Sequence, residues 1–488
     1  MKKLLFLFVS LTLLGGLISA QQGLTLDLAM EIAEQSSPAI KRTKFSLQRS
    51  QENLNAQRAA MKSNFSLSIN PFEYSNNREF LDFASQWNNT ERYESSGSLT
   101  VSQPIVATDA SVSLTNSLSW QDVYSEYNDT RTTGFNNNLF LNINQPIFTY
   151  NRAKMQIKEL ELALENSQIG YALQKLMMER YVAQSFYSVY QQQQSLEISD
   201  EAYRNMQNSY DIIKNKVEAG LSAREELFQA ELNLATSRSS YENSIVSLEN
   251  AKDDFKLLIG MSIYDDLIVI PDISVDTVEV DVVFAIDQGL ANRMELRQRE
   301  IDIENAEFSL IQTKAMNEFK GDVNLSMGLF GDNENFGQIY ETPRNNQSVS
   351  LSLRIPLYDW GEKKSRIKAA EISIESQKLS MDEEENDIII NIRKVYRNLN
   401  NLKNQIKIAE QNVINAQLTY DLNLERYENG DLTGMDLNLF QNQLSEKKLS
   451  HTNSLITYKL ELLNLKIQTL YDFETKVQVT PVKTLEEN

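Results

Sequence analysis

The chain has 488 residues, a formal net charge of −20, no cysteine and one histidine, His451. These counts exclude disulfides, a lipidated cysteine anchor, Cys–His nucleophile pairs and zinc sites of the usual kind, and the acidic excess argues against a nucleic-acid partner. Only 16 glycines and 8 prolines interrupt the chain, which is typical of a few very long elements rather than several compact domains.

The first 20 residues have the pattern of a secretory signal peptide. Two lysines follow Met1, residues 4–18 are apolar, and small residues precede Gln21. A membrane anchor is the alternative, but the apolar stretch is short for a membrane span and no later run of about 18 apolar residues occurs. We therefore expect an exported protein that is periplasmic, secreted or inserted in the outer membrane as β-strands.

An internal repeat organises the rest of the chain. At an offset of 210 residues the sequence aligns with itself without a gap over about 115 residues, so that Pro146 matches Pro356 and Gly220 matches Gly430. Such a constant register predicts two copies of one structural unit.

A second alignment, at an offset of 256 residues, matches residues 28–67 with 284–323. The two offsets differ by 46 residues, so the first copy carries an insertion between its two matched parts. Apolar and polar residues alternate within residues 97–121, which predicts that the insertion is an extra β-hairpin.

The hydrophobic period predicts these segments in chain order: 21–62, first helix of copy one; 63–147, strands with the extra hairpin; 148–260, long helix, tip turn and return helix; 261–282, linker between copies; 283–320, first helix of copy two; 321–357, strands; 358–470, long helix, tip turn and return helix; 471–488, C-terminal tail.

The element lengths predict the architecture. Each long helix covers about 67 residues, or ~100 Å. In the long helix of copy two, the apolar residues from Ile388 to Tyr420 follow the 4-3 spacing of a coiled coil. Strands of about 7–11 residues, such as the one through Phe65 and Leu67, suit a tilted membrane strand. Four to six strands cannot close a barrel alone, so several chains must share one. The expected fold is α+β and mostly α, a long coiled-coil helical tunnel joined to an oligomeric transmembrane β-barrel.

Two doubled motifs carry a resemblance to a known family. The strand-to-helix junctions at Pro146 and Pro356 read NQPIFTYNRAK and RIPLYDWGEKK, and the tip turns combine a glycine with a later acidic residue and leucine. Both resemble the TolC-type outer-membrane efflux proteins. That resemblance implies a homotrimer with a 12-stranded barrel, four strands per protomer, above a 12-helix tunnel. Because of the extra hairpin, the number of strands in the barrel is either 12 or 18.

The resemblance also implies a gate at the periplasmic tips. Asp436 matches the first acidic residue of a pore ring, whereas the second falls on Leu439. Tyr427 matches a tyrosine that ties the closed tips, but its arginine partner falls on Leu432. The alternative role for Asp436 is that of a favourable acid in the first turn of a helix.

Other candidate residues concern docking and the membrane interface. The resemblance implies that the tips contact a periplasmic adaptor, through Gly220, Leu221, Glu226, Gly430 and Leu432. In place of the missing arginine, ion pairs at the closed tips would come from Glu425, Arg426, Glu428 and Asp431. Aromatic residues suited to an interfacial belt are Trp120, Tyr150, Phe330, Tyr358 and Trp360.

The expected function is that of a passive export duct in the outer membrane with a long periplasmic extension, serving a tripartite efflux pump or type I secretion system. Its partners would be a periplasmic adaptor, an inner-membrane RND or ABC transporter and outer-membrane lipid. No catalytic, metal or cofactor residues are expected. One alternative is a non-conducting trimeric coiled-coil structural or adhesive protein; another is a soluble periplasmic adaptor or hydrolase. Drugs, metal ions and secreted proteins all remain open as cargo.

Overall fold

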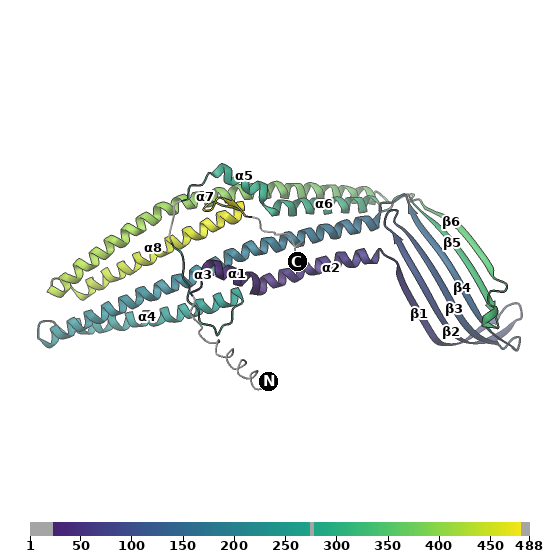
Figure 1. Cartoon of the computed structure of the whole chain (residues 1–488), viewed down its shortest axis with the longest axis horizontal. Coiled ribbons are helices and arrows are strands. Elements are labelled where there is room, and N and C mark those ends of the chain that lie inside the picture. Colours follow the sequence, from purple (N-terminus) through teal and green to yellow (C-terminus); the bar gives the residue numbers. More distant parts are fainter. Residues whose placement is uncertain (1–22, 274–277, 480–488) are drawn as a thin grey trace, which may run out of the picture. The chain divides into compact units, whose positions relative to one another are not determined.

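The computed structural model describes residues 23–273 and 278–479. The predicted signal peptide, residues 1–20, and the end of the predicted tail, residues 480–488, lie outside the described residues. The elements in chain order (Figure 1) are α1 (Leu26–Ser36), α2 (Pro38–Ala60), β1 (Asn64–Leu81), β2 (Gln86–Ile105), β3 (Ala110–Ser125), β4 (Thr130–Ile147), α3 (Arg152–Glu218), α4 (Arg224–Ile259), α5 (Val282–Asn292), α6 (Met294–Lys314), β5 (Lys320–Asn333), the 3₁₀ turn η1 (Phe336–Gln338), β6 (Arg344–Arg354), α7 (Glu362–Asn429), α8 (Gly434–Thr469), β7 (Tyr471–Asp472) and β8 (Val477–Gln478).

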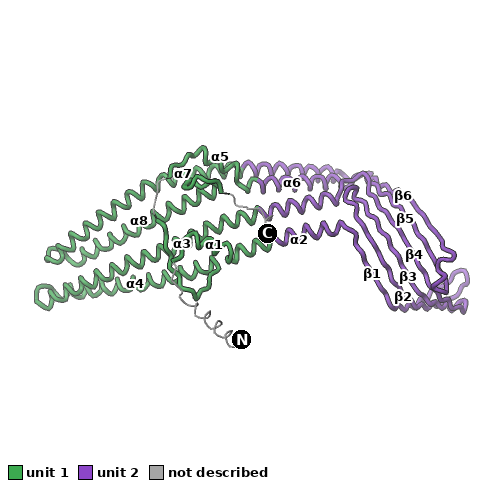
Figure 2. The backbone as a smooth tube through the Cα atoms, viewed as in Figure 1, with its two compact units in different colours: residues 1–46, 169–296, 383–488 green, residues 47–168, 297–382 purple. Residues whose placement is uncertain are grey.

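The chain divides into two compact units, which are coloured separately in Figure 2. The hairpin unit consists of residues 1–46, 169–296 and 383–488, and the sheet unit of residues 47–168 and 297–382. Within the described residues the sheet unit contains all of β1–β6, and the hairpin unit contains the helix pairs α3/α4 and α7/α8 from residues 169 and 383 onward.

Six antiparallel strands form the sheet, in the order β1-β2-β3-β4-β5-β6. They are 11–20 residues long, and all except β6 are longer than the 7–11 residues predicted, because pairing continues beyond the alternating segments into polar sequence. Tight turns join the first four strands, and Asp109 and Asp129 there have φ of 60° and 44°, a left-handed conformation that aspartate tolerates better than most residues.

The sheet has one apolar and one polar face. Residues paired across the strands form rows, and neighbouring rows point to opposite faces. One row consists of Phe65, Val101, Leu114, Leu141 and Met327, all apolar, and ends at Gln347. The next row consists of Asn64, Ser102, Ser113, Asn142, Ser326 and Ser348, all polar. This alternation separates the two faces over six neighbouring strands.

A charge cluster joins two helical segments within the sheet unit. Arg297 of α6 donates to both carboxylate oxygens of Glu165 in α3, at 2.7 and 3.0 Å, and also to Glu300 and Glu304 at 2.8 and 3.1 Å. The hydrogen bond from Arg297 lowers the pKa of Glu165 below its ordinary value. Because these side chains are about one-third exposed, solvent screens the pairs and their contribution to stability is modest.

Coiled-coil packing forms the cores of the hairpin unit. In α7 the 4-3 positions Ile388, Ile392, Val395, Leu399, Leu402, Ile406 and Ala409 are buried. In α3 the equivalent face uses aromatic residues, with the ring of Phe186 packed edge-to-face on Phe255 at a centroid distance of 6.0 Å. The fully buried Ala29 and Ala33 of α1 join the same core, because small side chains allow a close approach. This mostly helical chain with an antiparallel sheet confirms the α+β class.

Both first helices are divided, where the sequence predicted one helix in each copy. Ser37 separates α1 from α2 and Arg293 separates α5 from α6, both with non-helical backbone. The two breaks are one repeat offset of 256 residues apart. At Ser37 the cause is Pro38, which disfavours helical backbone in the preceding residue. Met294 stands at the equivalent position, so proline does not explain the second break.

The segment predicted as a C-terminal tail begins with a small hairpin. Strands β7 and β8 pair antiparallel, and the rings of Tyr471 and Phe473 pack against Phe284 of α5 with centroid distances of 5.1 and 6.3 Å. This aromatic cluster fixes the end of α8 to the second-copy core. None of the helices in the described ranges combines the length and the apolar character that a membrane span needs.

Candidate functional site

The hairpin tips are the first part of the candidate site. The first tip is residues 216–226, and the second tip is residues 426–436. Gly220 and Gly430 have φ of 75° and 87°, a left-handed conformation that glycine adopts without steric cost. Leu221 N–H donates to the Lys216 carbonyl and Asp431 N–H to the Arg426 carbonyl, at 2.8 and 2.9 Å. Both helices thus end in the same glycine-capped turn.

Asp436 lies in the first turn of α8, exposed to solvent. Thr433 accepts a hydrogen bond from the Asp436 N–H at 3.2 Å and donates its hydroxyl to the Asp436 carboxylate at 2.8 Å. This is a reciprocal capping arrangement. At the first tip, Ala223 stands at the N-cap and has no capping side chain, while Ser222 donates to Glu226 at 2.7 Å.

Tyr427 is buried, with 2% of its surface exposed. Its hydroxyl donates to the Ser209 carbonyl of α3 at 3.2 Å, and Lys216 Nζ donates to the Tyr427 carbonyl at 3.1 Å. The same ammonium lies 5.4 Å from the ring centroid, within cation–π range. Burial raises the pKa of Tyr427 to about 12, and the charge of Glu226 acts in the same direction. The tyrosine therefore joins the two helical hairpins as a protonated donor.

Polar side chains extend this connection along the hairpins. Asn205 donates to the buried Gln441 at 2.8 Å, and Lys448 donates to both oxygens of Glu201 at 2.9 and 2.7 Å. Sequence reasoning missed these residues, together with Ser209 and Lys216. Their partners are more than 200 positions away, and no local pattern marks them.

Among the described residues of one chain, the ion pairs expected at the second tip are absent. In the described part of the molecule, none of Glu425, Arg426, Glu428 and Asp431 forms an ion pair with another residue. Arg426 instead approaches Asn423 Oδ1 at 3.4 Å. Tyr427 and Lys216 provide the observed link at this end of the hairpins.

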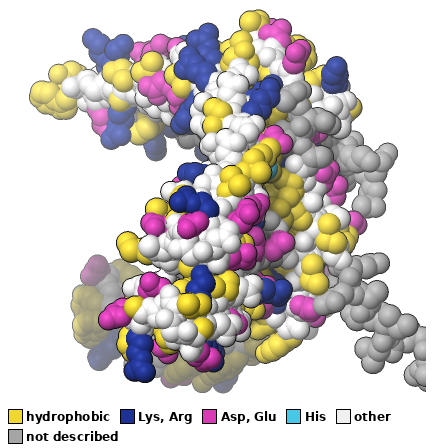
Figure 3. Space-filling model, turned by 90° about the vertical axis from the view of Figure 1, so that its left-hand side faces the viewer, with side chains coloured by type: hydrophobic (Ala, Val, Ile, Leu, Met, Phe, Trp, Pro, Cys, Tyr) yellow, Lys and Arg dark blue, Asp and Glu magenta, His cyan; other side chains and the backbone are white. Residues whose placement is uncertain are grey.

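The expected docking residues differ in their exposure. Leu221 is 79% exposed at the first tip, whereas Leu432 packs partly against the second-tip core. Met435, which sequence analysis did not select, is 75% exposed. Figure 3 looks onto this end and shows acidic and basic side chains mixed with apolar ones. The tips thus present apolar and charged groups together.

The two junctions predicted from proline lie between strand and helix. Pro146 is the second-to-last residue of β4, where it pairs with Asp322, and Pro356 lies two residues after the end of β6. Asp359 caps α7 by accepting from the N–H groups of Gly361 and Lys363, both at 3.0 Å, and the bond from Lys363 lowers its pKa. Asn151 caps α3 through the Lys154 N–H at 2.8 Å.

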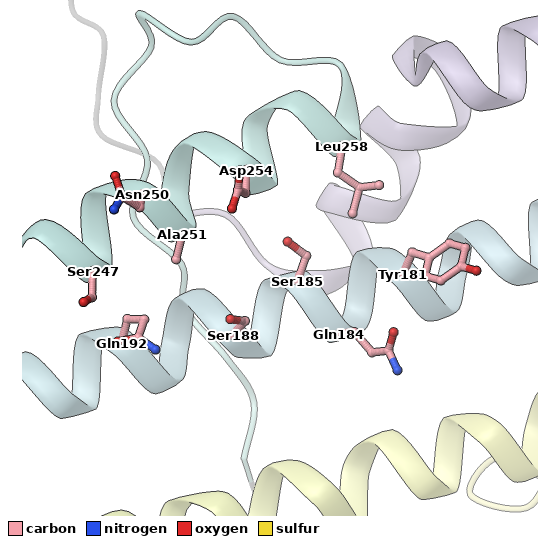
Figure 4. A pocket seen from close by; sticks show the side chains of 10 residues that line it. All are labelled: Tyr181, Gln184, Ser185, Ser188, Gln192, Ser247, Asn250, Ala251, Asp254 and Leu258. Carbon is pink, nitrogen blue, oxygen red and sulfur yellow. The ribbon is translucent and has the colours of Figure 1, made fainter. Parts of the chain in front are cut away.

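A polar groove runs between α3 and α4 (Figure 4). It has a volume of about 630 Å³ and is lined by Tyr181, Gln184, Ser185, Ser188, Gln192, Ser247, Asn250, Ala251, Asp254 and Leu258. The lining offers hydroxyls, amides and one carboxylate but pairs no nucleophile with a base. Within the described ranges no group of three or more His, Asp or Glu residues is arranged to hold a metal ion.

A second cavity of the hairpin unit, of about 530 Å³, is lined by seven charged side chains. It lies among α1, α3, α8 and the segment after α8, and its charged lining residues are Asp27, Glu179, Asp272, Lys459, Lys466, Asp472 and Glu474. Burial raises the pKa of Glu179, although Lys466 and Lys175 oppose the shift. Lys459 pairs with Glu474 at 3.5 Å and Lys466 with Asp472 at 3.2 Å.

Comparison with known proteins assigns the chain to a family. Residues 110–260 and 285–465, most of both copies, match the family described as outer membrane efflux protein. The chain belongs to this outer-membrane efflux protein family, which confirms the resemblance stated from the sequence. Members are channels rather than enzymes, located in the outer membrane with a helical extension in the periplasm.

Individual relatives are distant. The chain is 24% identical over 136 residues to the outer membrane protein TolC of Salmonella enteritidis, a match that spans 28% of each protein. The fold is similar to the Campylobacter jejuni CmeC outer membrane channel, with a TM-score of 0.69 at 12% identity, covering 91% of this chain and 85% of that one. The outer membrane protein VceC of Vibrio cholerae gives a TM-score of 0.65 at 14% identity, with 92% and 95% covered.

Proposed function

We propose that the chain forms a passive homotrimeric export duct of a tripartite efflux pump or a type I secretion system. The observation that carries this proposal is the two-faced sheet in a chain of this family. Its apolar rows suit lipid, and its rows of serine and asparagine suit a water-filled lumen. The helical hairpins would continue the conduit through the periplasm, and a partner transporter would supply the energy.

The proposed partners meet at the hairpin tips. A periplasmic adaptor, linked to an inner-membrane RND or ABC transporter, would dock on exposed groups such as Leu221, Glu226 and Met435. Gly220 and Gly430 would form the turns of the docking surface, with the half-buried Leu432 supporting it. Tyr427, buried between the hairpins, would hold the tips closed until docking separates them.

Recordings in planar lipid bilayers test the duct. The purified full-length protein should insert and give discrete current steps, because a closed barrel with a polar interior conducts ions. Protein that inserts as a trimer without any current would favour the alternative of a non-conducting structural or adhesive protein. Protein released from cells without detergent would favour a soluble adaptor.

The pore ring at Asp436 is tested in the same recordings. Asp436→Asn removes three carboxylate charges from a trimer but keeps an oxygen that can accept from Thr433. Block by multivalent cations should weaken by about tenfold or more, the equivalent of about 1.4 kcal/mol. The matched control is Glu226→Gln, at the equivalent position of the first copy. Equal block in wild type and Asp436→Asn would exclude Asp436 from the gate.

A further inference from the structure

Both edges of the six-stranded sheet lack a partner strand among the described residues. Strand β1 pairs only with β2, and β6 pairs only with β5. Each edge therefore presents a series of backbone N–H and C=O groups without strand partners. A lipid environment cannot satisfy these groups, so open sheet edges do not persist there.

Residues 64–70 of β1 and 345–353 of β6 lack the charged residues and prolines that protect sheet edges in soluble proteins, whereas beyond Asn70 strand β1 carries Pro71, Glu73, Arg78 and Glu79. Charged residues of β6 occur only at its ends, Arg344 and Arg354, and every residue of the strand is exposed. A bulge between Asn70 and Glu73 interrupts β1, but the segment before it is regular. Six apolar side chains on the two edges are 49–74% exposed: Phe65, Leu67, Ile69, Val349, Leu351 and Leu353. Natural edges are usually blunted by lysine, proline or a covering segment.

The strand number suits pairing between copies of this chain. Because the sheet has six strands, an even number, β1 and β6 run in opposite directions. Placing β6 of one copy beside β1 of the next therefore continues the antiparallel order without interruption. A foreign strand could cover one edge, but it would leave the other edge of the complex open.

The stagger of the strand ends indicates a register. The row that begins at Asn64 reaches Ser348, and β6 continues for six more residues to Arg354. If the strand ends at this side are level in a closed barrel, Arg354 lies beside Asn64 of the next copy. A stagger of six residues over six strands corresponds to a strand tilt of about 35°, within the range of outer-membrane barrels.

The same register matches side-chain types at both edges. It places Leu351 beside Leu67 and Ser350 beside Ser68, so apolar residues meet on one face and polar residues on the other. A shift of one residue would place apolar residues against polar ones. Over residues 64–70 of β1 and 348–354 of β6, the edges are therefore complementary in backbone direction and pattern.

We propose that β6 of each copy pairs with β1 of the next copy in this register, so that a trimer closes an 18-stranded barrel. The inference rests on the trimer of the proposed function and departs from the 12 strands that the family resemblance implies. At a tilt of about 35° and a strand spacing of about 4.8 Å, the backbone diameter increases from about 22 Å for 12 strands to about 34 Å for 18. Barrels of 16–18 strands leave an aqueous channel.

Disulfide cross-linking in the outer membrane tests the closure. The chain contains no cysteine, so the double variant Ser68→Cys/Ser350→Cys carries only the two introduced thiols. These positions lie on opposite edges of the sheet, and antiparallel neighbours fall within disulfide distance. Mild oxidation should give covalently linked dimers and trimers on non-reducing gels. A matched control is Ser117→Cys/Ser350→Cys, because Ser117 of β3 lies in the same row as Ser68 but away from the edge.

The outcomes separate the closure from the proposed function. Covalent trimers from the edge pair, with at least about tenfold less from the control pair, would support the 18-stranded barrel, because disulfides need close Cα atoms. A native trimer of the same variant that forms no β6–β1 disulfide would overturn the closure and leave the duct intact. A covalent ring of any other number of copies would overturn the 18 strands. Absence of trimers from the membrane would instead contradict the proposed function.

Discussion

The two hairpin tips come from one repeated unit but are stabilised differently. At the second tip Tyr427 is buried and Thr433 caps the return helix. At the first tip Val217 and Ala223 occupy the equivalent positions, so the buried ring and the capping hydroxyl are both absent. The comparison indicates that glycine is enough to form the turn, whereas packing of the tip against the other hairpin depends on side chains that only the second repeat carries.

The return helices also differ between the two repeats, because α8 is buried over more of its length than α4. Buried residues occur along α8 from Leu437 onward, but in α4 they begin only at Leu248. Phe228 and Leu232 of α4 are 66% and 60% exposed, whereas α8 carries asparagine at both equivalent positions. An apolar helix face that is exposed in one chain is a surface for another chain. We therefore expect a neighbouring copy to cover α4.

The largest expected effect comes from copying the second sequence into the first. Phe228→Asn together with Leu232→Asn removes two apolar side chains from the exposed face of α4. If a neighbouring copy covers them, association should weaken by about 3–6 kcal/mol per copy. Native mass spectrometry of the detergent-extracted protein should then show dissociated trimers. The control Asn442→Ala alters the equivalent of Leu232 and should remain trimeric; trimers in the double variant would contradict the comparison.

Removal of the buried ring at the second tip is expected to have the next largest effect. Tyr427→Ala should lower the local stability of the tip by about 3–5 kcal/mol, because a large side chain leaves a cavity. Amide hydrogen exchange at the ends of α7 and α8 should accelerate by roughly 100-fold or more. Val217→Ala, the matched change, should cost about 1 kcal/mol or less. Equal acceleration in both variants would show that the tips are held alike.

Exchange of the capping residues should change the stability of the two return helices in opposite directions. Thr433→Ala removes the side-chain acceptor at the start of α8 and should cost about 1 kcal/mol, whereas Ala223→Thr should stabilise the start of α4 by a similar amount. Hydrogen exchange of the first turn of each helix measures both changes. The same direction of change in the two variants would argue against capping as the cause.

The smallest expected effect concerns Glu179, whose equivalent in the second copy is Ile389. Burial raises the pKa of Glu179 in the folded chain. The contribution of the protonated side chain to the free energy of unfolding is therefore complete below the unfolded pKa and is lost as pH rises through the folded pKa. Glu179→Gln should therefore raise the melting temperature at pH 7 by about 2 °C, with less gain near pH 4. The exposed Glu231→Gln is the control. A gain that does not depend on pH would exclude the charge as its cause.

The sequence predicts the elements within each repeat better than the contacts between the two repeats of one chain. Alternation in residues 97–121 marks the extra hairpin, and the 4-3 spacing after Ile388 marks a buried seam, because both signals are local. The bond from Tyr427 to Ser209 joins residues more than 200 positions apart and has no local pattern. The helix break at Arg293 is not predicted by a proline, because Met294 follows it. Strands β1–β5 are longer than the sequence predicts, because their outer parts do not alternate between apolar and polar residues.

Single-particle imaging of the protein extracted from the outer membrane in mild detergent tests the central claim most directly. The account predicts a three-fold tube of ~100 Å or more, the length of a 67-residue helix such as α3, joined to a detergent-covered barrel of 18 strands. Monomers, or compact particles without a detergent belt, would contradict a duct shared by several copies.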